Sequence, residues 1–439
     1  MNLKKYAENL LSNFKDSRTL KNIESLLIKI KENKSLKIWS VSENRADYER
    51  SKRLLDGSLN TLLDDKKIRD ALKDRTVSSL IKNDSLILLH DPCDLRKEHS
   101  KKLEDIGKVR ALNGKIINGY STFNTVVVDH KGMELRLLDT EFYSNREDNY
   151  VSSSELKSPD KLSAERSQKV KNLIKEENYI NLFKITCQQL KKSSESFKLL
   201  KPEIVLCHVL DRGFDGNNYF GFIDGQLKDN FVIRLKASRL SDDRVTKLTQ
   251  SKFSDEVNIF VEKVMIKSKV YQDVTVKIEA NTFESYKVVR VTLSDRNVKN
   301  IFREPMLLIT NLEIENTQQL INVYETYLMR SKIESVFKFL KSELGWEDFQ
   351  QRDFESIKNI VTLAYFIAGY FYEIEKIAVD NKTIKWLAQL GKGKGKVTRH
   401  FILLGLVRII HFQEVQKFIN DNNLSHEEVA EMLSYAKVK

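Results

Sequence analysis

Cysteine is scarce in this sequence, and its scarcity excludes several classes of protein. The three cysteines are Cys93, Cys187 and Cys207, and no two of them have the CxxC spacing. A disulfide framework and a cysteine zinc site are therefore excluded, and we expect a reducing compartment, the cytoplasm. The seven histidines show no HxxxH or HExxH spacing, so the sequence offers no zinc-protease motif either.

Targeting and membrane-spanning segments are also lacking. The first residues, MNLKKYAENL, are charged and contain no apolar core of a signal peptide. The longest apolar stretch, Ile360–Tyr372, is too short to span a bilayer, so it predicts a buried helix and no membrane partner. There are only four prolines, no internal repeat and no low-complexity tract, so composition marks no domain linker.

The charge balance is basic. Lys and Arg number 74 against 62 Asp and Glu, which gives a formal net charge of +12. With 41% hydrophobic residues the chain is globular, and 439 residues suffice for about two to four domains. A folded protein with a basic surface makes nucleic acid the first partner to consider, and a lysine-rich surface that only faces water is the alternative. The GKGKGK run at 391–396 lacks Walker spacing and indicates a basic loop.

The first 80 residues have the apolar periodicity of helices. A helix over Arg45–Leu55 gathers basic side chains on one side, which is typical of a helical reader of DNA ends. A solvated helix face explains the same pattern.

The period then changes to that of strands. We expect buried strands at Ser85–Leu89 and Ile204–Leu210, a hairpin of Asn124–Val128 with Met133–Leu138, and a helix over Leu173–Phe197. Strands dominate from Phe231 to about Val298, and one more follows at Met306–Thr310. After Trp346 the chain is again helical, chiefly at Ile357–Ala378 and Arg399–Ile410. This order predicts an α/β fold: a mixed sheet with crossover helices, interrupted by a β-rich insertion.

The stretch YLMRSKIESVFKFLK predicts one helix over Tyr327–Lys341. At about 100° per residue, one narrow stripe of this helix carries Tyr327, Arg330, Glu334, Lys338 and Lys341. The opposite arc carries Met329, Ile333, Val336, Phe337 and Leu340 and is expected to be buried. One acid is thus held among cations and a tyrosine, which suits a metal-held carboxylate beside a phosphate chain. An amphipathic helix with charge pairs such as Glu334 with Lys338 is the alternative.

Two aspartates follow predicted strands, where ligands bind in α/β sheets. Asp91 follows SLILLH and Asp211 follows IVLCHVL, whereas the nearby Asp94 and Asp215 are better suited to capping turns. Convergence of Asp91 and Asp211 with Glu334 would bring three repelling carboxylates together, which requires divalent cations. Oxygen-only ligands favour Mg²⁺ or Mn²⁺, and two such ions can promote in-line displacement at phosphorus.

Basic residues are expected to hold the nucleic acid. Arg330, Lys338 and Lys341 can bind backbone phosphates, and Tyr327 can donate one hydrogen bond to the same backbone. Arg234, Lys236 and Arg239, in FVIRLKASR, either face DNA or lie on a solvated sheet face.

These residues resemble a known family. The spacing Tyr327-x2-Arg330-x3-Glu334-x6-Lys341 matches the Y-(2)-R-(3)-E-(6)-K pattern of bacterial insertion-sequence DDE transposases of the IS-four type. HDPCDLRK and DRGFD resemble that family's two aspartate segments, and REPMLLITNL and FKFLKSELGWEDFQ are similar to the text around its glutamate helix. The resemblance extends from about residue 45 to 410.

The resemblance implies an RNase H-like catalytic core broken by a β-strand insertion. It divides the chain into a helical DNA-end-binding domain (1–80), core (81–213), insertion (214–304), core (305–345) and a helical C-terminal region with a possible dimerisation role (346–439). It assigns Asp91, Asp211 and Glu334 as the catalytic, metal-binding acids, and it places Tyr327, Arg330 and Lys341 on the transposon-end phosphates.

The activity implied is cutting of double-stranded DNA at terminal inverted repeats, followed by joining of the 3′ ends to target DNA. The family works as a homodimer that pairs two ends, so we expect this chain at the bacterial nucleoid. Some members use an insertion-domain tryptophan against a flipped base; here no tryptophan lies between Asp211 and Glu334. The candidate substitutes are Phe231, Tyr271, Phe283 and Tyr286. An RNase H-like nuclease without joining activity and an inactive copy that only binds DNA are the alternatives.

Overall fold

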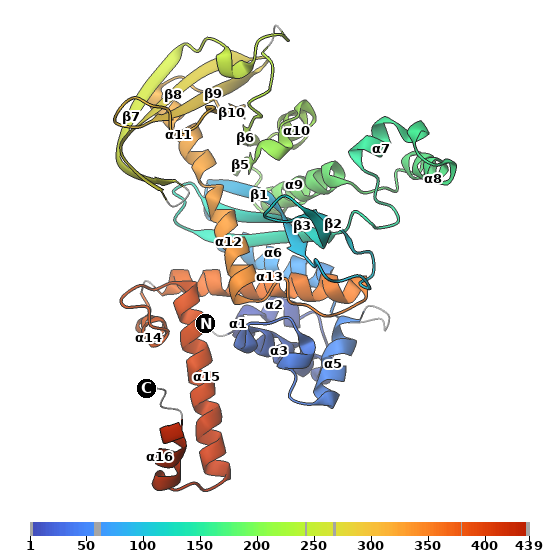
Figure 1. Cartoon of the computed structure of the whole chain (residues 1–439), viewed down its shortest axis with the longest axis vertical. Helices are drawn as coiled ribbons and strands as arrows, with labels where there is room; N and C mark the ends of the chain where they lie inside the picture. The colour runs from blue at the N-terminus through green and yellow to red at the C-terminus, as the bar shows by residue number, and fades with distance from the viewer. Residues whose placement is uncertain (1–2, 57–62, 242–243, 267–268, 379, 436–439) are drawn as a thin grey trace.

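A single mixed β-sheet organises the chain in the computed structural model (Figure 1), which describes residues 3–56, 63–241, 244–266, 269–378 and 380–435. Within these ranges the sheet has ten strands: β1 (Ser85–Arg96), β2 (Gly107–Arg110), β3 (Ile116–Asp129), β4 (Leu135–Tyr143), β5 (Val205–Leu210), β6 (Asn230–Arg234), β7 (Asp255–Ile266), β8 (Lys269–Phe283), β9 (Tyr286–Ser294) and β10 (Met306–Thr310). Their order is β2-β3-β1-β5-β6-β10-β9-β8-β7, with β4 paired to β3. The α/β prediction is confirmed.

The central part of the sheet consists of β4, β3, β1, β5 and β6. β3 is antiparallel to β1 and β4 to β3, whereas β5 is parallel to β1 and β6 is parallel to β5. Parallel strands are normally covered on both faces, which requires continuous apolar runs. The run in β1 meets this need, because Leu86 and Leu88 pack with Phe197 on one face while Ile87 and Leu89 belong to the large core on the other.

The second part of the sheet is antiparallel and curls away from the centre (Figure 1). β7, β8 and β9 form a meander, β9 pairs with β10, and β10 pairs with β6. The predicted run of strands between Phe231 and Val298 is thereby confirmed. Its first strand, β6, pairs in parallel with β5, so the proposed insertion of 214–304 begins ahead of a strand that belongs to the central sheet.

Helices build the rest of the molecule. At the N-terminal end lie α1 (Leu3–Tyr6), α2 (Glu8–Leu11), α3 (Ser17–Asn33), α4 (Ile38–Val41), α5 (Arg45–Leu55) and α6 (Asp65–Leu80). Between β4 and β6 lie α7 (Ser153–Lys157), α8 (Ala164–Lys175), α9 (Leu182–Lys198) and α10 (Asn217–Gly221). After β10 follow α11 (Thr317–Leu328), α12 (Ser331–Glu343), α13 (Phe354–Ile377), α14 (Lys382–Leu390), α15 (Arg399–Asp421) and α16 (His426–Tyr435).

The apolar stretch at Ile360–Tyr372 lies inside α13, where all of its residues are buried. This confirms the buried helix predicted there, and α13 packs against β4, α6 and α12. No helix within the described ranges has the length and apolar character needed to cross a membrane.

Three predicted boundaries are wrong, each for a local reason. The helix predicted over Leu173–Phe197 is two helices, because Glu177 adopts a left-handed φ of 53° and the Asn181 side chain caps the start of α9. The strand predicted to end at Leu89 continues to Arg96. Pro92, taken as its terminator, is tolerated because it lies beyond the residues that pair with β5 and so has no ladder bond there to lose.

The third wrong boundary concerns the stretch Tyr327–Lys341. The single helix predicted over Tyr327–Lys341 is a junction of two helices, since α11 ends at Leu328 and α12 begins at Ser331. Arg330 keeps right-handed helical angles at the junction (φ −52°, ψ −34°), so the two helices run on with little change of direction, as Figure 1 shows.

Candidate active site

Three acidic side chains meet at one guanidinium. Arg330 Nη1 lies 2.8 Å from Asp91 Oδ2, and Arg330 Nη2 lies 2.7 Å from Glu334 Oε1 and 4.0 Å from Asp211 Oδ2. Asp91 comes from β1, Asp211 directly follows β5, and Glu334 lies in the first turn of α12. The structure therefore brings together all three acids that the sequence analysis selected.

Strand register accounts for the first two acids. β1 and β5 run parallel with Leu89 opposite Val209, and each aspartate lies two residues further along its own strand. Because the side chains of residues two apart point to the same face, Asp91 and Asp211 emerge together where β5 ends. Although Asp91 lies inside the long β1, it lies two residues beyond the last pair of the parallel ladder.

The helical junction supplies the remaining groups. Tyr327, at the end of α11, is only 6% exposed, and its hydroxyl donates to Asp211 Oδ1 over 3.1 Å. Arg330 and Glu334 then form an i,i+4 pair across the start of α12. Among the described ion pairs, Glu334 is partnered by Arg330 and not by Lys338, which was the alternative reading of the helix.

Burial governs the electrostatics of the cluster. Removal from water raises the pKa of Asp91 to about 7; Arg330 opposes this rise, while Asp211 and Glu334 add to it. Burial acts to lower the pKa of Arg330, but the surrounding acids outweigh it and hold that pKa above the usual range. Burial and Asp211 raise the pKa of Tyr327 to about 12, so its hydroxyl stays protonated and available as a donor.

The donor set fits a hard divalent cation, because it consists of carboxylate oxygens. One Arg⁺ cannot neutralise three carboxylates, and Asp211 and Glu334 add to the rise that burial causes in the pKa of Asp91. Within the described residues no group of three acidic, His or Cys side chains is spaced to hold a metal as it stands. Arg330 lies between the acids, and the carboxylates contact its guanidinium.

Lys338 and Lys341, the two lysines of α12 that were predicted to bind phosphate, have different environments. Lys341 Nζ donates to the Asp94 carbonyl over 2.6 Å and to Glu347 Oε1 over 3.0 Å, so it joins α12 to β1. Lys338 is exposed and takes part in none of the ion pairs found in the described ranges. Both line a cavity of about 660 Å³ beside Glu334 that also receives Arg96 and Arg110.

Arg234, which ends β6, and Arg239, which lies in the following loop, have different surroundings. Arg234 lies beside Tyr327 and acts to lower its pKa, so it belongs to the site. Arg239 is instead engaged by Asp215 and Asn217 and lies over the rings of Phe220 and Phe283. The structure does not bring Arg239 to the acids.

Four aromatic residues were candidates for contact with a flipped DNA base, and Asp94 was expected to cap a turn. Phe231 and Phe283 are buried, so neither presents its ring to a DNA base, whereas Tyr271 and Tyr286 are half-buried. Asp94 accepts from the Arg110 amide and the Ser121 hydroxyl, in keeping with the structural role expected for it.

A buried polar chain behind the acids was not predicted. His90 Nδ1 lies 2.9 Å from Thr125 Oγ1, His90 Nε2 lies 2.9 Å from His208 Nδ1, and His208 Nε2 lies 3.1 Å from Asp229 Oδ2. Burial, and then His208, lower the pKa of His90. Both histidines are buried in the core, and no sequence spacing indicated that they would bond to each other.

Comparison with known proteins gives no relative: no protein-family model and no curated protein matches this sequence. Assignment of a function therefore depends on the residues and their geometry.

Proposed function

We propose that this protein is a metal-dependent DNA transposase of the insertion-sequence DDE type. The observation that carries the proposal is the meeting of Asp91, Asp211 and Glu334 at one guanidinium. Roughly 120 residues of chain separate each acid from the next, so the cluster exists only in the folded protein. A buried carboxylate with a strongly perturbed pKa beside charged partners, as Asp91 is here, is a frequent feature of functional sites.

The sheet supports an RNase H-like core as part of this proposal. After β1 to β4, whose pairings are all antiparallel, the chain adds β5 and β6 in parallel to β1. It then leaves the central sheet through β7–β9 and returns at β10 to the helices that carry Glu334. A core of this kind interrupted by a β-rich insertion predicts such an order.

The acids would hold two Mg²⁺ or Mn²⁺ ions, which supply activation of the attacking oxygen and stabilisation of the leaving oxygen at phosphorus. The chain's own residues bind and orient the DNA strand around them. Tyr327 keeps its proton and donates a hydrogen bond. Lys338, which has no ion pair among the described residues, offers its ammonium group to a phosphate. When cations compensate the acids, the Arg330 guanidinium becomes available to a phosphate as well.

The proposed reaction has two steps on double-stranded DNA. Water attacks the phosphodiester at a terminal inverted repeat, and the departing 3′-oxygen takes up a proton to become a hydroxyl. That 3′-hydroxyl then attacks a phosphodiester of the target DNA, whose own 3′-oxygen leaves. Two ends are joined in this way by a homodimer working on the bacterial nucleoid.

The test is DNA cleavage by acid variants on a duplex that carries the DNA flanking the gene. We expect Asp211→Ala to lose cleavage by at least a thousandfold while binding of the duplex is largely kept. Asp84→Ala is the matched control, because Asp84 is an exposed aspartate just ahead of β1 that pairs with Lys201 and not with Arg330. Cleavage by Asp211→Ala at the wild-type rate would contradict the proposal.

Joining activity separates the proposal from its two alternatives. A duplex with a pre-cut 3′ end should be inserted into plasmid DNA by the wild-type protein. A nuclease without joining activity would cut but leave the plasmid intact, and an inactive copy would only bind.

A further inference from the structure

A second basic cavity opens on the other side of the acids. It has a volume of about 630 Å³ and reaches Asp211 itself. Its charged lining consists of Arg212, Arg234, Lys236 and Lys247, together with Asp211 and Glu304. Arg234 and Lys236 were candidate DNA contacts in the sequence, whereas Arg212 and Lys247 were not.

These cations come from three separate segments. Arg212 lies in the turn after β5, Arg234 ends β6 and Lys236 follows it, and Lys247 lies beyond the following loop. Asp215 fixes this wall, because its carboxylate accepts from the Lys236 amide over 2.8 Å and also pairs with the Arg239 guanidinium. Arg239 and Asp215 are therefore positioning residues for the cavity.

Within the described residues, the cavity is lined by more basic than acidic side chains. In the described part of the chain, Arg212, Lys236 and Lys247 take part in no ion pair and no side-chain hydrogen bond. Two acids against four bases leave an excess of positive charge, and like charges held close together repel. An anion in the cavity would relieve that repulsion, and a phosphate is the anion that arginine and lysine together bind well.

We propose that this cavity is a binding site for backbone phosphates of a nucleic-acid strand, on the Asp211 side of the acids. It rests on the proposed function for its choice of DNA among phosphate-bearing ligands. The cavity of Lys338, Arg96 and Arg110 lies on the Glu334 side. A strand that crosses from one cavity to the other brings the phosphodiester between them onto the acids.

The test is the salt dependence of DNA binding by Lys236→Gln/Lys247→Gln, measured by fluorescence anisotropy in EDTA so that no cleavage occurs. Each lost phosphate contact lowers the slope of log K against log salt by about 0.9 and weakens binding about eightfold at 0.1 M salt. We therefore expect a slope about 1.8 smaller for the double variant. Two labelled probes are used: a duplex of the DNA flanking the gene, and a duplex of random sequence and equal length.

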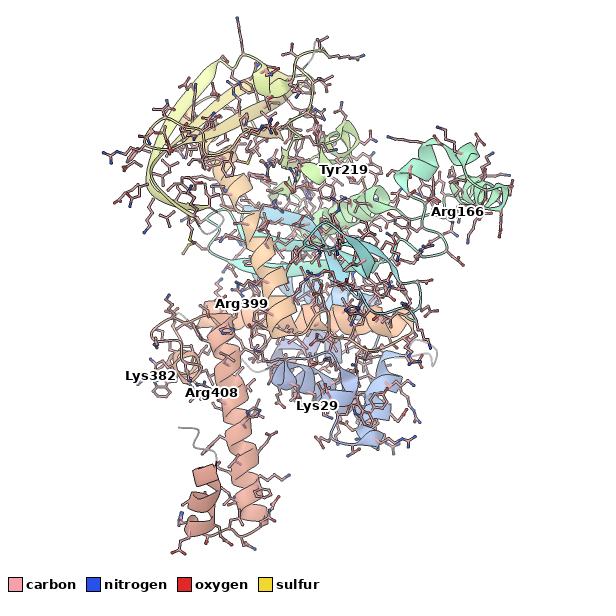
Figure 2. All side chains as sticks on the ribbon, in the orientation of Figure 1. Lys29, Arg166, Tyr219, Lys382, Arg399 and Arg408 are labelled. Atoms are coloured by element: carbon pink, nitrogen blue, oxygen red, sulfur yellow. The ribbon has the colours of Figure 1, made fainter. Side chains whose placement is uncertain are left out.

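Lys161→Gln/Lys175→Gln is the matched control. Both of these lysines are exposed and lie on the segment with α7 and α8, which projects away from β6 and β10 in Figure 2, where Arg166 marks it. This control removes the same charge and should leave the slope unchanged. The unfolding midpoint of each variant checks that its fold is intact.

A smaller slope with the flanking probe alone assigns the cavity to the DNA end that is cut, and a smaller slope with both probes assigns it to duplex DNA of any sequence. An unchanged slope with both probes, or an equal change in the control, overturns the proposal. Because binding is read without catalysis, failure of the cleavage test would leave this result interpretable, and the reverse also holds.

Discussion

Removal of Arg330 should make the stability of the protein depend on divalent cations. The perturbation is Arg330→Gln, which keeps a polar side chain but takes away the charge that three carboxylates share. Without that charge, Asp91, Asp211 and Glu334 repel one another in EDTA. A divalent cation would then be the remaining source of compensation.

The magnitude follows from burial. The Arg330 and Asp91 side chains are 15% and 17% exposed, whereas Glu334 is 59% exposed. Removing one partner of a fully buried pair costs about 3–5 kcal/mol, and partial access of water reduces the expected loss here to about 2–3 kcal/mol. For a chain of 439 residues this corresponds to a fall in unfolding midpoint of roughly 2–3 °C.

The assay is thermal unfolding at pH 8, above the pKa of about 7 that Asp91 has in the wild-type protein, in EDTA and then with increasing Mn²⁺. Mn²⁺ at about a hundred times its dissociation constant adds about 2.7 kcal/mol to the variant and restores its stability. The wild-type protein should gain less, because the ion must first displace Arg330. Arg166→Gln is the control: it breaks an ion pair with Glu155 away from the acids and should not respond to Mn²⁺.

The dependence on pH gives a further check of the same reasoning. Between about pH 4 and 7 the folded protein binds a proton on Asp91 that the unfolded chain releases, so protonation relieves the repulsion. The deficit of Arg330→Gln in EDTA should thus shrink as the pH falls from 8 to 6. A variant as stable as wild type in EDTA, or one indifferent to Mn²⁺, would refute the view that Arg330 compensates the acids.

Two other predictions follow from the same contacts. The affinity of the wild-type protein for Mn²⁺, measured by calorimetry, should weaken up to about tenfold for each pH unit below about 7 and level off above it, because the ion competes with the proton on Asp91. A flat profile from pH 6 to 8 would argue against Asp91 as a ligand. Arg69→Met should lower the free energy of unfolding, measured by urea titration, by about 3–5 kcal/mol, because Arg69 is the buried partner of Asp139 and Glu141. A loss below about 1 kcal/mol would show that other groups compensate these acids.

The convergence of the acids was predictable from the sequence because it depends on short-range patterns. Asp91 and Asp211 each follow an apolar run, and parallel pairing of two such runs brings their ends to the same edge. Glu334 was found from the stripe it shares with Tyr327 and Arg330, and that stripe survives the junction between α11 and α12 because Arg330 keeps helical angles.

The features that sequence reasoning missed depend on contacts between distant segments. Arg239 was a candidate DNA contact, but Asp215, from the turn after β5, engages its guanidinium. Lys341 also binds the Asp94 carbonyl of β1, a contact between segments far apart in the sequence. The cavity beside Asp211 draws its cations from three segments, and no period or motif connects them.

The buried chain of His90, His208 and Asp229 was missed for the same reason. His90 and His208 come from neighbouring strands whose partners are set by sheet order, and Asp229 precedes β6. The apolar residues around the two histidines indicated burial, but they did not indicate that His90 would bond to His208, or His208 to Asp229.

Cutting of the polypeptide by bound Fe²⁺ tests the central claim most directly. Fe²⁺ takes carboxylate ligands in place of Mg²⁺, and with ascorbate and peroxide it produces radicals that break the backbone close to the ion. We predict breaks near residues 91, 211 and 334 in one protein, all suppressed by excess Mg²⁺ and absent in Asp91→Asn. Breaks confined to one of these segments, or breaks that Mg²⁺ does not suppress, would contradict a shared cation site.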